Sequence, residues 1–266
     1  MPACEARPAA TVMVVRPAQS AGHCPELLLL RRARTVGFFP SAWVFPGGRV
    51  DPADARAACR GAVAGLPQED RAFGVAAARE TFEEAGVWVG DGPADEALRD
   101  RLNNRTATLD DAPELVAHLD RLTWWSWWIT PESEPKRYDT RFFLCIVRPD
   151  EVSHAAHDNS ETVQTLWLSA GAALERHQQG TLFMAPPTFR TLTELAPLKT
   201  VEAIAEAARH RCPRAIQPRL EKLPTGKGFN IVLPGDPSYP SAAAVRGPTR
   251  MNWVDGHWED GGVVLP

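Results

Sequence analysis

Long hydrophobic runs and a strong charge imbalance are both missing from this chain of 266 residues. No segment approaches the roughly 18 apolar residues that a membrane-spanning helix needs, and no basic stretch at the N-terminus leads into a long apolar one. The formal net charge of −4 gives no overall attraction for a polyanion such as DNA. We therefore expect a globular, unexported protein with no membrane and no nucleic acid among its partners.

Cysteine is scarce, and its five residues are widely spread, at positions 4, 24, 59, 145 and 212. No C-x-x-C pair indicates a zinc site or a redox dithiol. Reduced thiols in a cytoplasm fit this odd number and spacing best, so we expect a cytoplasmic protein. None of the seven histidines has a spacing that indicates a site.

Apolar residues are plentiful enough, at 44% of the chain, to bury a full core. Apolar and β-branched runs predict strands at residues 10–15, 26–31, 42–45, 124–129, 141–147 and 163–168. Periodic segments predict helices at residues 71–85, 94–102, 112–122, 170–179, 188–196 and 200–210. Strands that are interleaved with helices and followed by them favour an α/β or α+β fold, with a mixed sheet between helices.

A short strand, a glycine loop and a long helix follow one another between residues 42 and 86. The strand must end at Pro46-Gly47-Gly48, because proline cannot donate to a ladder and glycine allows a close approach of the backbone. Asp70 is placed to cap the start of the helix, and Gly86 is placed to end it in a left-handed conformation.

Three carboxylates crowd one face of this helix. At about 100° per residue, Glu80, Glu83 and Glu84 point to the same side, where their charges repel one another. A divalent cation removes that conflict, and hard oxygen ligands of this kind suit Mg²⁺. Arg79 lies four residues before Glu83 and can hold its carboxylate in place. For such a run by itself, a solvated acidic face with one ion pair is the alternative interpretation.

The glycine loop and the acidic helix together resemble the Nudix box, whose pattern is G-x5-E, seven residues, then R-E-U-x-E-E-x-G-U, with U apolar. Gly48 and Asp54 take the places of the first half, and residues 79–87, Arg-Glu-Thr-Phe-Glu-Glu-Ala-Gly-Val, match the second. The resemblance implies a Nudix-like mixed sheet between helices. It also implies a hydrolase that depends on Mg²⁺ or Mn²⁺ and cuts the diphosphate bridge of a nucleotide derivative.

The chain departs from this pattern at three places. Asp54 stands where the family has Glu, Thr81 stands at an apolar position, and 24 residues separate Asp54 from Arg79. A surface excursion between a loop and a helix can be long at small entropic cost, so we expect this one to be peripheral. Because the excursion begins directly after Asp54, we expect this acid to cap or solvate the loop and not to face the metal.

The resemblance also divides the chain. Residues 1–198 would form the Nudix-like domain, with residues 55–78 as an insertion and helix start within the box and residues 93–123 as a helical insertion. Residues 199–266 would form an extension packed on the same domain. Short apolar runs in that extension, such as residues 229–233, indicate strands and loops.

A box interrupted between its halves resembles the branch of the family that hydrolyses coenzyme A (CoA) and its thioesters. Softer likenesses lie at residues 27–32, at Phe38-Phe39-Pro40, and at residues 135–143 and 185–189. They imply CoA or acyl-CoA as the substrate, with 3′,5′-ADP and a phosphopantetheine derivative as products. The box leaves ADP-ribose, NADH and nucleoside triphosphates open as substrates. A non-catalytic nucleotide sensor is the alternative from another class.

Roles for single residues follow from the same resemblance. The positions that carry the metal ions in the family are here Glu80, Glu83 and Glu84, joined by the Gly47 carbonyl. One more acid is commonly supplied from outside the box as a ligand or general base, and Glu161, just before a predicted strand, has the right setting. An ordinary loop carboxylate is the alternative for Glu161. The candidate catalytic residues are therefore Arg79, Glu83, Glu84 and Glu161.

Basic and aromatic residues near the predicted cleft supply candidates for substrate binding. A guanidinium binds phosphate oxygens bidentately, although each arginine alone is also typical of a surface; the candidates are Arg32, Arg49 and Arg141. The four tryptophans within residues 124–128 offer planar surfaces for adenine, although tryptophan in a strand more often packs in a core. The expected partner is a small nucleotide diphosphate, and a homodimer is compatible with the sequence.

Overall fold

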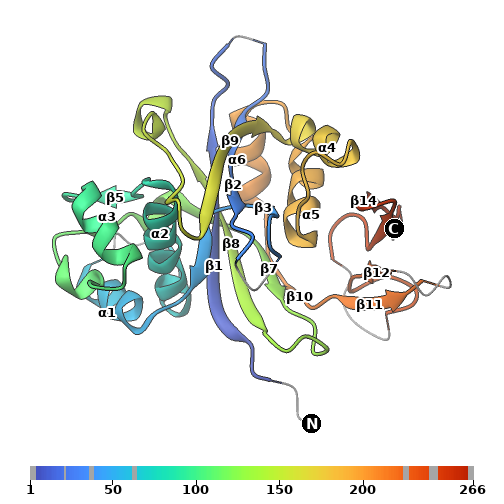
Figure 1. Cartoon of the computed structure of the whole chain (residues 1–266), viewed down its shortest axis with the longest axis horizontal. Helices are drawn as coiled ribbons and strands as arrows, with labels where there is room; N and C mark the ends of the chain where they lie inside the picture. The colour runs from blue at the N-terminus through green and yellow to red at the C-terminus, as the bar shows by residue number, and fades with distance from the viewer. Residues whose placement is uncertain are drawn as a thin grey trace.

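The computed structural model describes residues 4–20, 22–35, 39–61, 65–223, 228–239 and 245–262. Its centre is a mixed sheet in the order β10-β7-β8-β1-β2-β3, with β4 paired to β1 and β9 paired to β2 (Figure 1). Strand β1 runs parallel to β8 and antiparallel to β2 and β4. The strands of this sheet are β1 (Arg7–Arg16), β2 (Glu26–Arg32), β3 (Trp43–Val44), β4 (Gly47–Arg49), β7 (Leu122–Ile129), β8 (Tyr138–Ile146), β9 (Thr162–Ser169) and β10 (Ala215–Ile216).

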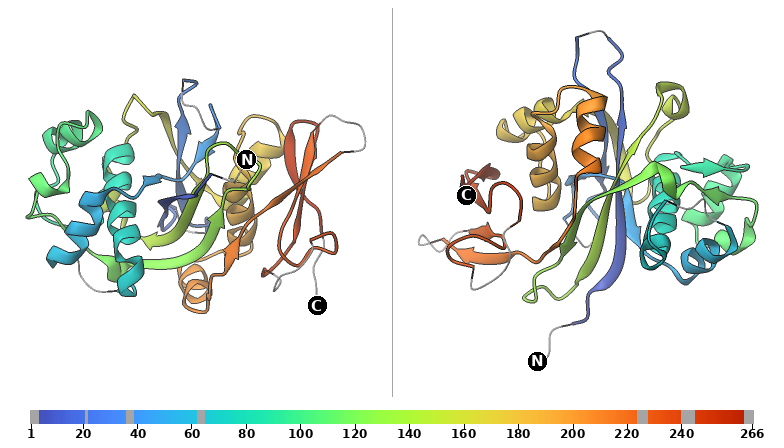
Figure 2. Two further views of the ribbon diagram at one scale, coloured as in Figure 1. Left: turned by 90° about the horizontal axis from the view of Figure 1, so that it is seen from below. Right: turned by 180° about the vertical axis from the view of Figure 1, so that it is seen from behind.

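Helices cover both faces of this sheet, as two further views show (Figure 2). On one face lie α1 (Pro52–Gly61), α2 (Arg71–Ala85) and α3 (Glu96–Asn103), and on the other lie α4 (Ala170–Gln178), α5 (Pro186–Leu195) and α6 (Val201–Arg209). Along β1, Val12 and Val14 belong to the first core and Met13 and Val15 to the second, because successive side chains of a strand point to opposite faces. The predicted α/β class, with a mixed sheet between helices, is confirmed.

Helix α2 has the predicted bounds and the predicted C-terminus. Gly86 has a φ of 71°, and its N–H donates to the Phe82 carbonyl at 2.8 Å. The start differs from prediction, because the Asp70 side chain makes no capping hydrogen bond. Asp70 ends a 3-10 turn, Gln68–Asp70, and its carboxylate lies 3.5 Å from Arg141 Nε. A tertiary ion pair has taken the place of the local cap.

The helix predicted at residues 112–122 is wrong. The structure places there strand β6 (Val116–Ala117), a 3-10 turn (Leu119–Arg121) and the start of β7. Strand β6 pairs with β5 (Gly90–Asp91), and the Leu119 side chain is completely buried against α2. The apolar spacing of residues 112–122 therefore correctly predicted which side chains are buried. Long-range strand pairing overrode the local preference for a helix.

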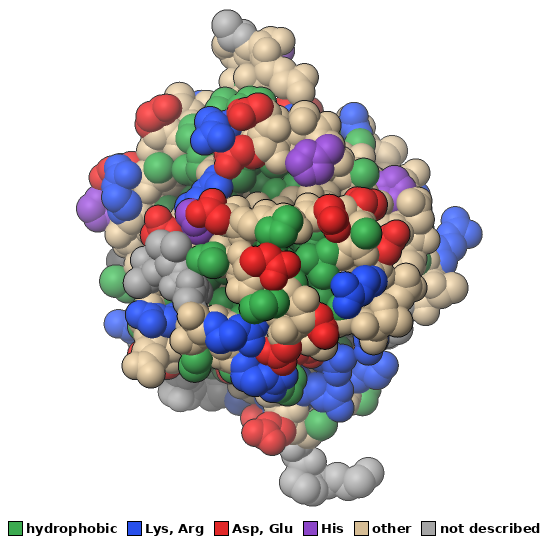
Figure 3. Space-filling view, turned by 90° about the vertical axis from the view of Figure 1, so that its left-hand side faces the viewer, with side chains coloured by type: hydrophobic (Ala, Val, Ile, Leu, Met, Phe, Trp, Pro, Cys, Tyr) green, Lys and Arg blue, Asp and Glu red, His purple; other side chains and the backbone are tan. Residues whose placement is uncertain are grey.

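The excursion between the halves of the box is a folded element. Helix α1 begins at Pro52, before Asp54, and packs against α2. On its outer side, Arg56 Nε and Arg60 donate to the Asp110 carboxylate, the former at 2.8 Å. Residues 62–64 of the excursion, and Phe38 of the motif before the box, lie outside the described residues. The outer face of these helices carries acidic and basic side chains side by side (Figure 3).

The C-terminal segment joins the main sheet and builds a second one. Strand β10 pairs in parallel with β7, and a four-stranded antiparallel sheet follows in the order β11-β12-β13-β14. Its strands are β11 (Arg219–Lys222), β12 (Phe229–Val232), β13 (Arg250–Val254) and β14 (His257–Asp260). Ile231, Met251 and Trp258 are buried in the same core as α5 and α6.

Two observations concern the expectations about membrane and thiols. Among the described residues, no helix is both long enough and apolar enough to cross a membrane. All five cysteines are free, and Cys145 is buried in the main sheet. None of the five cysteines forms a disulfide.

A buried histidine joins α4 to the C-terminal sheet. His177 is 1% exposed, its Nδ1 lies 2.8 Å from the Leu182 carbonyl, and its Nε2 accepts the Trp258 N–H at 2.8 Å. This acceptor role requires an unprotonated Nε2. Burial lowers the pKa of His177 below its usual value, and the ring of His257, 6.0 Å away, acts in the same direction.

We expect His177 to make stability depend on pH. The unfolded chain takes up a proton at about pH 6.5 and the folded chain only at lower pH, so the free energy of unfolding should fall as the pH drops below about 6.5. Urea unfolding at pH 7.5 and pH 5.5 should show a smaller loss of stability for His177→Gln than for wild type. Equal losses in both proteins would contradict this linkage.

Candidate active site

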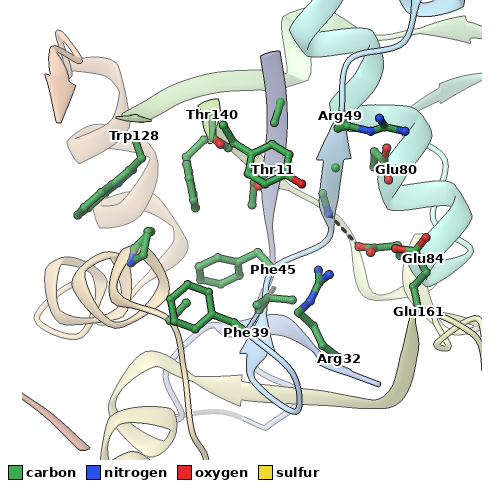
Figure 4. A pocket seen from close by; sticks show the side chains of 18 of the residues that line it. Thr11, Arg32, Phe39, Phe45, Arg49, Glu80, Glu84, Trp128, Thr140 and Glu161 are labelled. Atoms are coloured by element: carbon green, nitrogen blue, oxygen red, sulfur yellow. Dashed lines mark hydrogen bonds between the residues drawn. The ribbon is translucent and has the colours of Figure 1, made fainter. Parts of the chain in front are cut away.

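A cleft of ≈ 820 Å³ reaches from α2, past the loop between β3 and β4, to the C-terminal sheet. This volume is in the usual range for a small-molecule site. Figure 4 shows Glu80, Glu84 and Arg49 on one side of the cleft, with Trp128 and Phe45 across from them. The cleft therefore contains the acidic face of α2 that the sequence singled out.

The prediction that Gly47 and Gly48 lie in a loop is wrong, because both belong to strand β4, where they pair with Thr11 and Ala10 of β1. This glycine segment holds the acidic helix by direct contact. Gly47 N–H donates to Glu84 Oε2 at 2.9 Å, the bond drawn as a dashed line in Figure 4. A Cβ atom on Gly48 would lie 2.5 Å from the carboxylate oxygens of Glu80. A larger residue at position 48 would force the Glu80 carboxylate to move, so glycine here keeps this carboxylate in its place on the helix.

Arg79 is the cation at the centre of the acidic cluster. Its Nη1 donates to Glu80 Oε1 at 2.9 Å and to Glu83 Oε1 at 3.0 Å, and its Nη2 donates to the Arg49 carbonyl at 2.8 Å. Its side chain is only 5% exposed. Burial by itself would lower the pKa of Arg79, but Glu80, Asp54 and Glu83 raise it well above the ordinary value. The predicted contact between Arg79 and Glu83 is present.

Asp54 behaves only in part as the sequence suggested. Arg79 Nε and Nη2 donate to its two carboxylate oxygens at 2.8 and 2.9 Å, and the side chain is completely buried. Asp54 also accepts the Asp51 N–H at 2.7 Å, so it does cap the start of α1. The expectation that the excursion frees Asp54 from the box helix is wrong, because α1 carries this acid back onto Arg79. The shorter side chain thus serves a fork-like ion pair.

Thr81, the other departure from the pattern, is satisfied within its own helix. Its hydroxyl donates to the Ala77 carbonyl at 2.7 Å, and the residue is completely buried. A threonine that bonds one turn back can occupy an apolar position without leaving a polar atom unpaired. The substitution therefore leaves the packing face of α2 intact.

Burial of the glutamates disfavours their ionised forms. Burial, opposed by Arg79 and reinforced by Glu83, raises the pKa of Glu80 to about 7. Burial and then Glu80 raise the pKa of Glu84 well above its usual range, while the Gly47 N–H and Arg32 act in the opposite direction. Among the ion pairs of the described residues, none involves Glu84. A cation that entered this corner would favour the ionised form of both acids.

The donor chemistry of this corner suits a hard divalent cation, since carboxylate and carbonyl oxygens are the preferred ligands of Mg²⁺ and Mn²⁺. In the described part of the chain, no three acidic, cysteine or histidine side chains are already arranged around one point that could hold an ion. Glu80 and Glu83 turn toward Arg79, and Glu84 turns toward Gly47. An ion would therefore compete with Arg79 for the oxygens of Glu80 and Glu83, and with the Gly47 N–H for those of Glu84.

Glu161 lies beside Glu84 at the edge of the cleft (Figure 4). Its carbonyl accepts the Ala33 N–H at 2.8 Å, and its N–H donates to Asp158 Oδ2 at 3.2 Å. Asp158 also accepts the N–H of the buried Thr162 at 2.8 Å. The loop is thus fixed on both sides, and the negative charge of Glu161 contributes to the raised pKa of Glu84.

Two of the three predicted arginines line the cleft. Arg49 lies beside Glu80, and Arg32 extends toward Glu84 from the end of β2 (Figure 4). The buried Nε of Arg32 has no hydrogen-bond partner among the described residues. A buried donor without a partner beside the carboxylates is a ready contact for an anionic ligand.

The prediction that Arg141 frames the cleft is wrong. Its guanidinium lies 3.8 Å from the Trp127 ring, pairs with Asp139 at 2.5 Å and approaches Asp70, and it is not among the described residues of the lining. Thr140 and Phe142 line the cleft, so the alternation along β8 directs Arg141 to the other face of the sheet. Arg141 is therefore held in a structural cation–π and ion-pair cluster.

Only one residue of the tryptophan cluster reaches the cleft. Trp128 lines it, whereas Trp125 is buried in the second core and Trp124 and Trp127 pack around Arg141. The alternation of side chains along β7, with a register shift near Trp124, thus divides the rings into two pairs: Trp124 with Trp127 beside Arg141, and Trp125 with Trp128 in the second core.

Several lining residues gave no signal in the sequence. The end of α3 contributes Asn103, the loop after it contributes Arg105 and Thr108, and the C-terminal sheet contributes Leu220 and Phe229. Both segments are far from the box in the sequence, so no local pattern could connect them to it. Only the packing of α3 and of the C-terminal sheet brings them to the cleft.

Known proteins resemble this chain over most of its length. A family model described as the NUDT19 Nudix domain matches residues 58–195. The acyl-coenzyme A diphosphatase NUDT19 of Gallus gallus is 32% identical, covering 86% of this chain and 77% of that protein. The Homo sapiens protein of the same name is 30% identical, covering 88% of this chain and 76% of that protein.

A solved structure resembles the fold as well. The crystal structure of a NUDIX hydrolase from Alicyclobacillus acidocaldarius has a TM-score of 0.67 at 32% identity, covering 76% of this chain and 96% of that chain. The sequence, the fold and the acidic cleft thus point to the same family. The chain belongs to the Nudix hydrolases, in their coenzyme A diphosphatase branch, and is a Nudix-type diphosphate hydrolase.

Proposed function

We propose that the protein hydrolyses the diphosphate bridge of CoA or acyl-CoA, releasing 3′,5′-ADP and a phosphopantetheine product. The observation that carries this proposal is the buried glutamate cluster of α2, held against the Gly47-Gly48 segment inside a cleft of small-molecule size. The relatives that match most of the chain carry the name acyl-coenzyme A diphosphatase. The site supports hydrolysis of a diphosphate, and the names of these relatives support CoA or acyl-CoA as the substrate.

Glu80, Glu83, Glu84 and the Gly47 carbonyl are the groups that would hold Mg²⁺ or Mn²⁺. When bound, such an ion polarises the phosphate oxygens and lowers the pKa of a nucleophilic water. Burial, with repulsion from a neighbouring glutamate added to it, raises the pKa of Glu80 and Glu84, and this buried set of acids is the feature that supports the assignment. Metal ligands must also be held in place, and here Arg79 holds Glu80 while the Gly47 N–H holds Glu84.

The chain's own side chains would divide the remaining work. Arg32 and Arg49 reach the cleft on the two sides of the glutamates and would bind phosphate oxygens there. Glu161 has its backbone fixed and its side chain exposed at the edge of the cleft, so it would accept a proton from the attacking water. Arg79 would act as a positioning residue that aligns Glu80 and Glu83.

A product assay tests the substrate. The purified protein is incubated with Mg²⁺ or Mn²⁺ and CoA, acetyl-CoA, ADP-ribose, NADH or a nucleoside triphosphate, and the products are identified by mass. The proposal expects 3′,5′-ADP from the CoA substrates at the highest kcat/KM. Preference for one of the other substrates would replace CoA, and inactivity on all of them would favour a nucleotide sensor.

Loss of the carboxylate of Glu83 or of Glu84 should greatly slow turnover. Glu83→Gln and Glu84→Gln keep the size of the side chain but remove its charge, and each should lower kcat at least about 100-fold with the fold intact. Circular dichroism checks the fold, and Glu202→Gln, an exposed glutamate on α6, is the matched control. Near-normal turnover of either variant would remove α2 from the site.

The role of Glu161 can be separated from that of a loop carboxylate. Loss of a general base should lower kcat about 100-fold or more in Glu161→Gln while KM changes little. The hydrogen bonds that fix this loop come from the backbone of residue 161, so the substitution leaves them in place. Wild-type kcat in the variant would show that Glu161 has no part in proton transfer.

Asp54 should stabilise the protein through Arg79. Asp54→Asn leaves a buried guanidinium with one anionic partner fewer, which should lower the free energy of unfolding by about 2–3 kcal/mol and also lower kcat. The matched control is Asp110→Asn, because Asp110 also pairs with two arginines but at the surface, where solvent screens the charges and a much smaller loss is expected. Equal effects of the two substitutions in urea unfolding would contradict the central role of the buried pair.

A further inference from the structure

The C-terminal sheet supplies one wall of the active-site cleft. Strands β11, β12 and β14 and the chain before them contribute residues to the lining, and all of these are apolar: Pro218, Leu220, Phe229, Ile231 and Trp258. The carboxylates and Arg32 line the α2 side of the same cleft. One continuous cavity therefore has a charged end and an apolar end.

Strand register explains why these side chains form a surface. Leu220 is directly opposite Ile231, and Phe229 lies two residues before Ile231 on the same strand, so all three point to one face of the sheet. The Phe229 ring lies 5.9 Å from the ring of Trp258 on β14. Pro186 and Pro187 at the start of α5 line the same cleft and add further apolar side chains to it.

Part of this wall is open to solvent. Leu220 is 37% exposed and Phe229 is 38% exposed, whereas their neighbours Ile231 and Trp258 are 3% exposed. Among the described residues, the only other large hydrophobic side chain with comparable exposure is Val163, on β9. Exposed apolar groups that line a cleft mark a surface for an apolar ligand.

We infer that this apolar wall binds the acyl chain of an acyl-CoA whose diphosphate lies at the carboxylate end of the cleft, an inference that rests on the proposed function. The argument for this occupant is the continuity of the cavity. A substrate whose phosphates are held near Glu84 and whose other end is apolar can occupy both ends at once. A short or absent acyl group would leave Leu220 and Phe229 in contact with water.

A series of chain lengths tests this assignment on the wild-type protein. With CoA, acetyl-CoA and octanoyl-CoA as substrates, kcat/KM should rise about tenfold or more from acetyl to octanoyl, because the longer chain covers more apolar surface. Equilibrium binding of the same compounds to Glu84→Gln should show the same order, and this measurement does not depend on turnover.

Variants at the wall provide the second part of the test. Leu220→Ser and Phe229→Ser should lower the ratio of kcat/KM for octanoyl-CoA to that for CoA about tenfold, since both side chains are partly exposed and their loss spares the core. Val163→Ser is the matched control, because Val163 is equally exposed but does not line the cleft. It should leave the ratio unchanged.

Different failures have different meanings. Hydrolysis of CoA that is indifferent to chain length, or a ratio unaffected by both wall variants, would overturn the inference and leave the proposed function standing. A change of sedimentation coefficient in Phe229→Ser with an unchanged ratio would assign the wall to contact with a second copy of the chain. Failure to hydrolyse any CoA compound would overturn the proposed function itself.

Discussion

The buried guanidinium of Arg79 is the interaction on which the rest of the site depends. It donates to Asp54, Glu80, Glu83 and the Arg49 carbonyl, so one side chain connects α1, α2 and β4, the strand that contains Gly47 and Gly48. A buried cation is tolerable only when its charge and its donors are satisfied. The acids around it are therefore structural partners of Arg79 as well as candidate ligands for a metal ion.

The same arrangement leaves part of the negative charge on the acidic face of α2 without compensation. Arg79 can neutralise only part of the charge of its neighbours, and Glu84, which it does not contact, relies on the Gly47 N–H. Solvation of this face would have relieved the repulsion between the glutamates. Instead, the Gly47-Gly48 segment and Arg32 enclose this face. Its excess negative charge remains, and a divalent cation would neutralise it.

The cleft is a composite of segments that are distant along the chain. The excursion forms α1 and returns Asp54 to the box helix, the loop after α3 lines one edge, and the C-terminal sheet forms the apolar wall. The elements that depart from the short form of the Nudix pattern thus contribute to the site or to its support. In the proposed reaction, the residues of the box bind and hydrolyse the diphosphate, and the additional segments contact the rest of the substrate.

The sequence by itself determined the class of fold, the bounds of α2 and the family, because the apolar alternation of strands, a helix-ending glycine and the Nudix box are local patterns. It did not determine that Asp54 pairs with Arg79, that Arg141 turns away from the cleft, or that residues 112–122 pair with a strand and form no helix. Those outcomes depend on long-range packing and on ion pairs between elements far apart in the chain. For the same reason, only the tertiary structure placed Leu220 and Phe229 opposite the glutamates in one cavity.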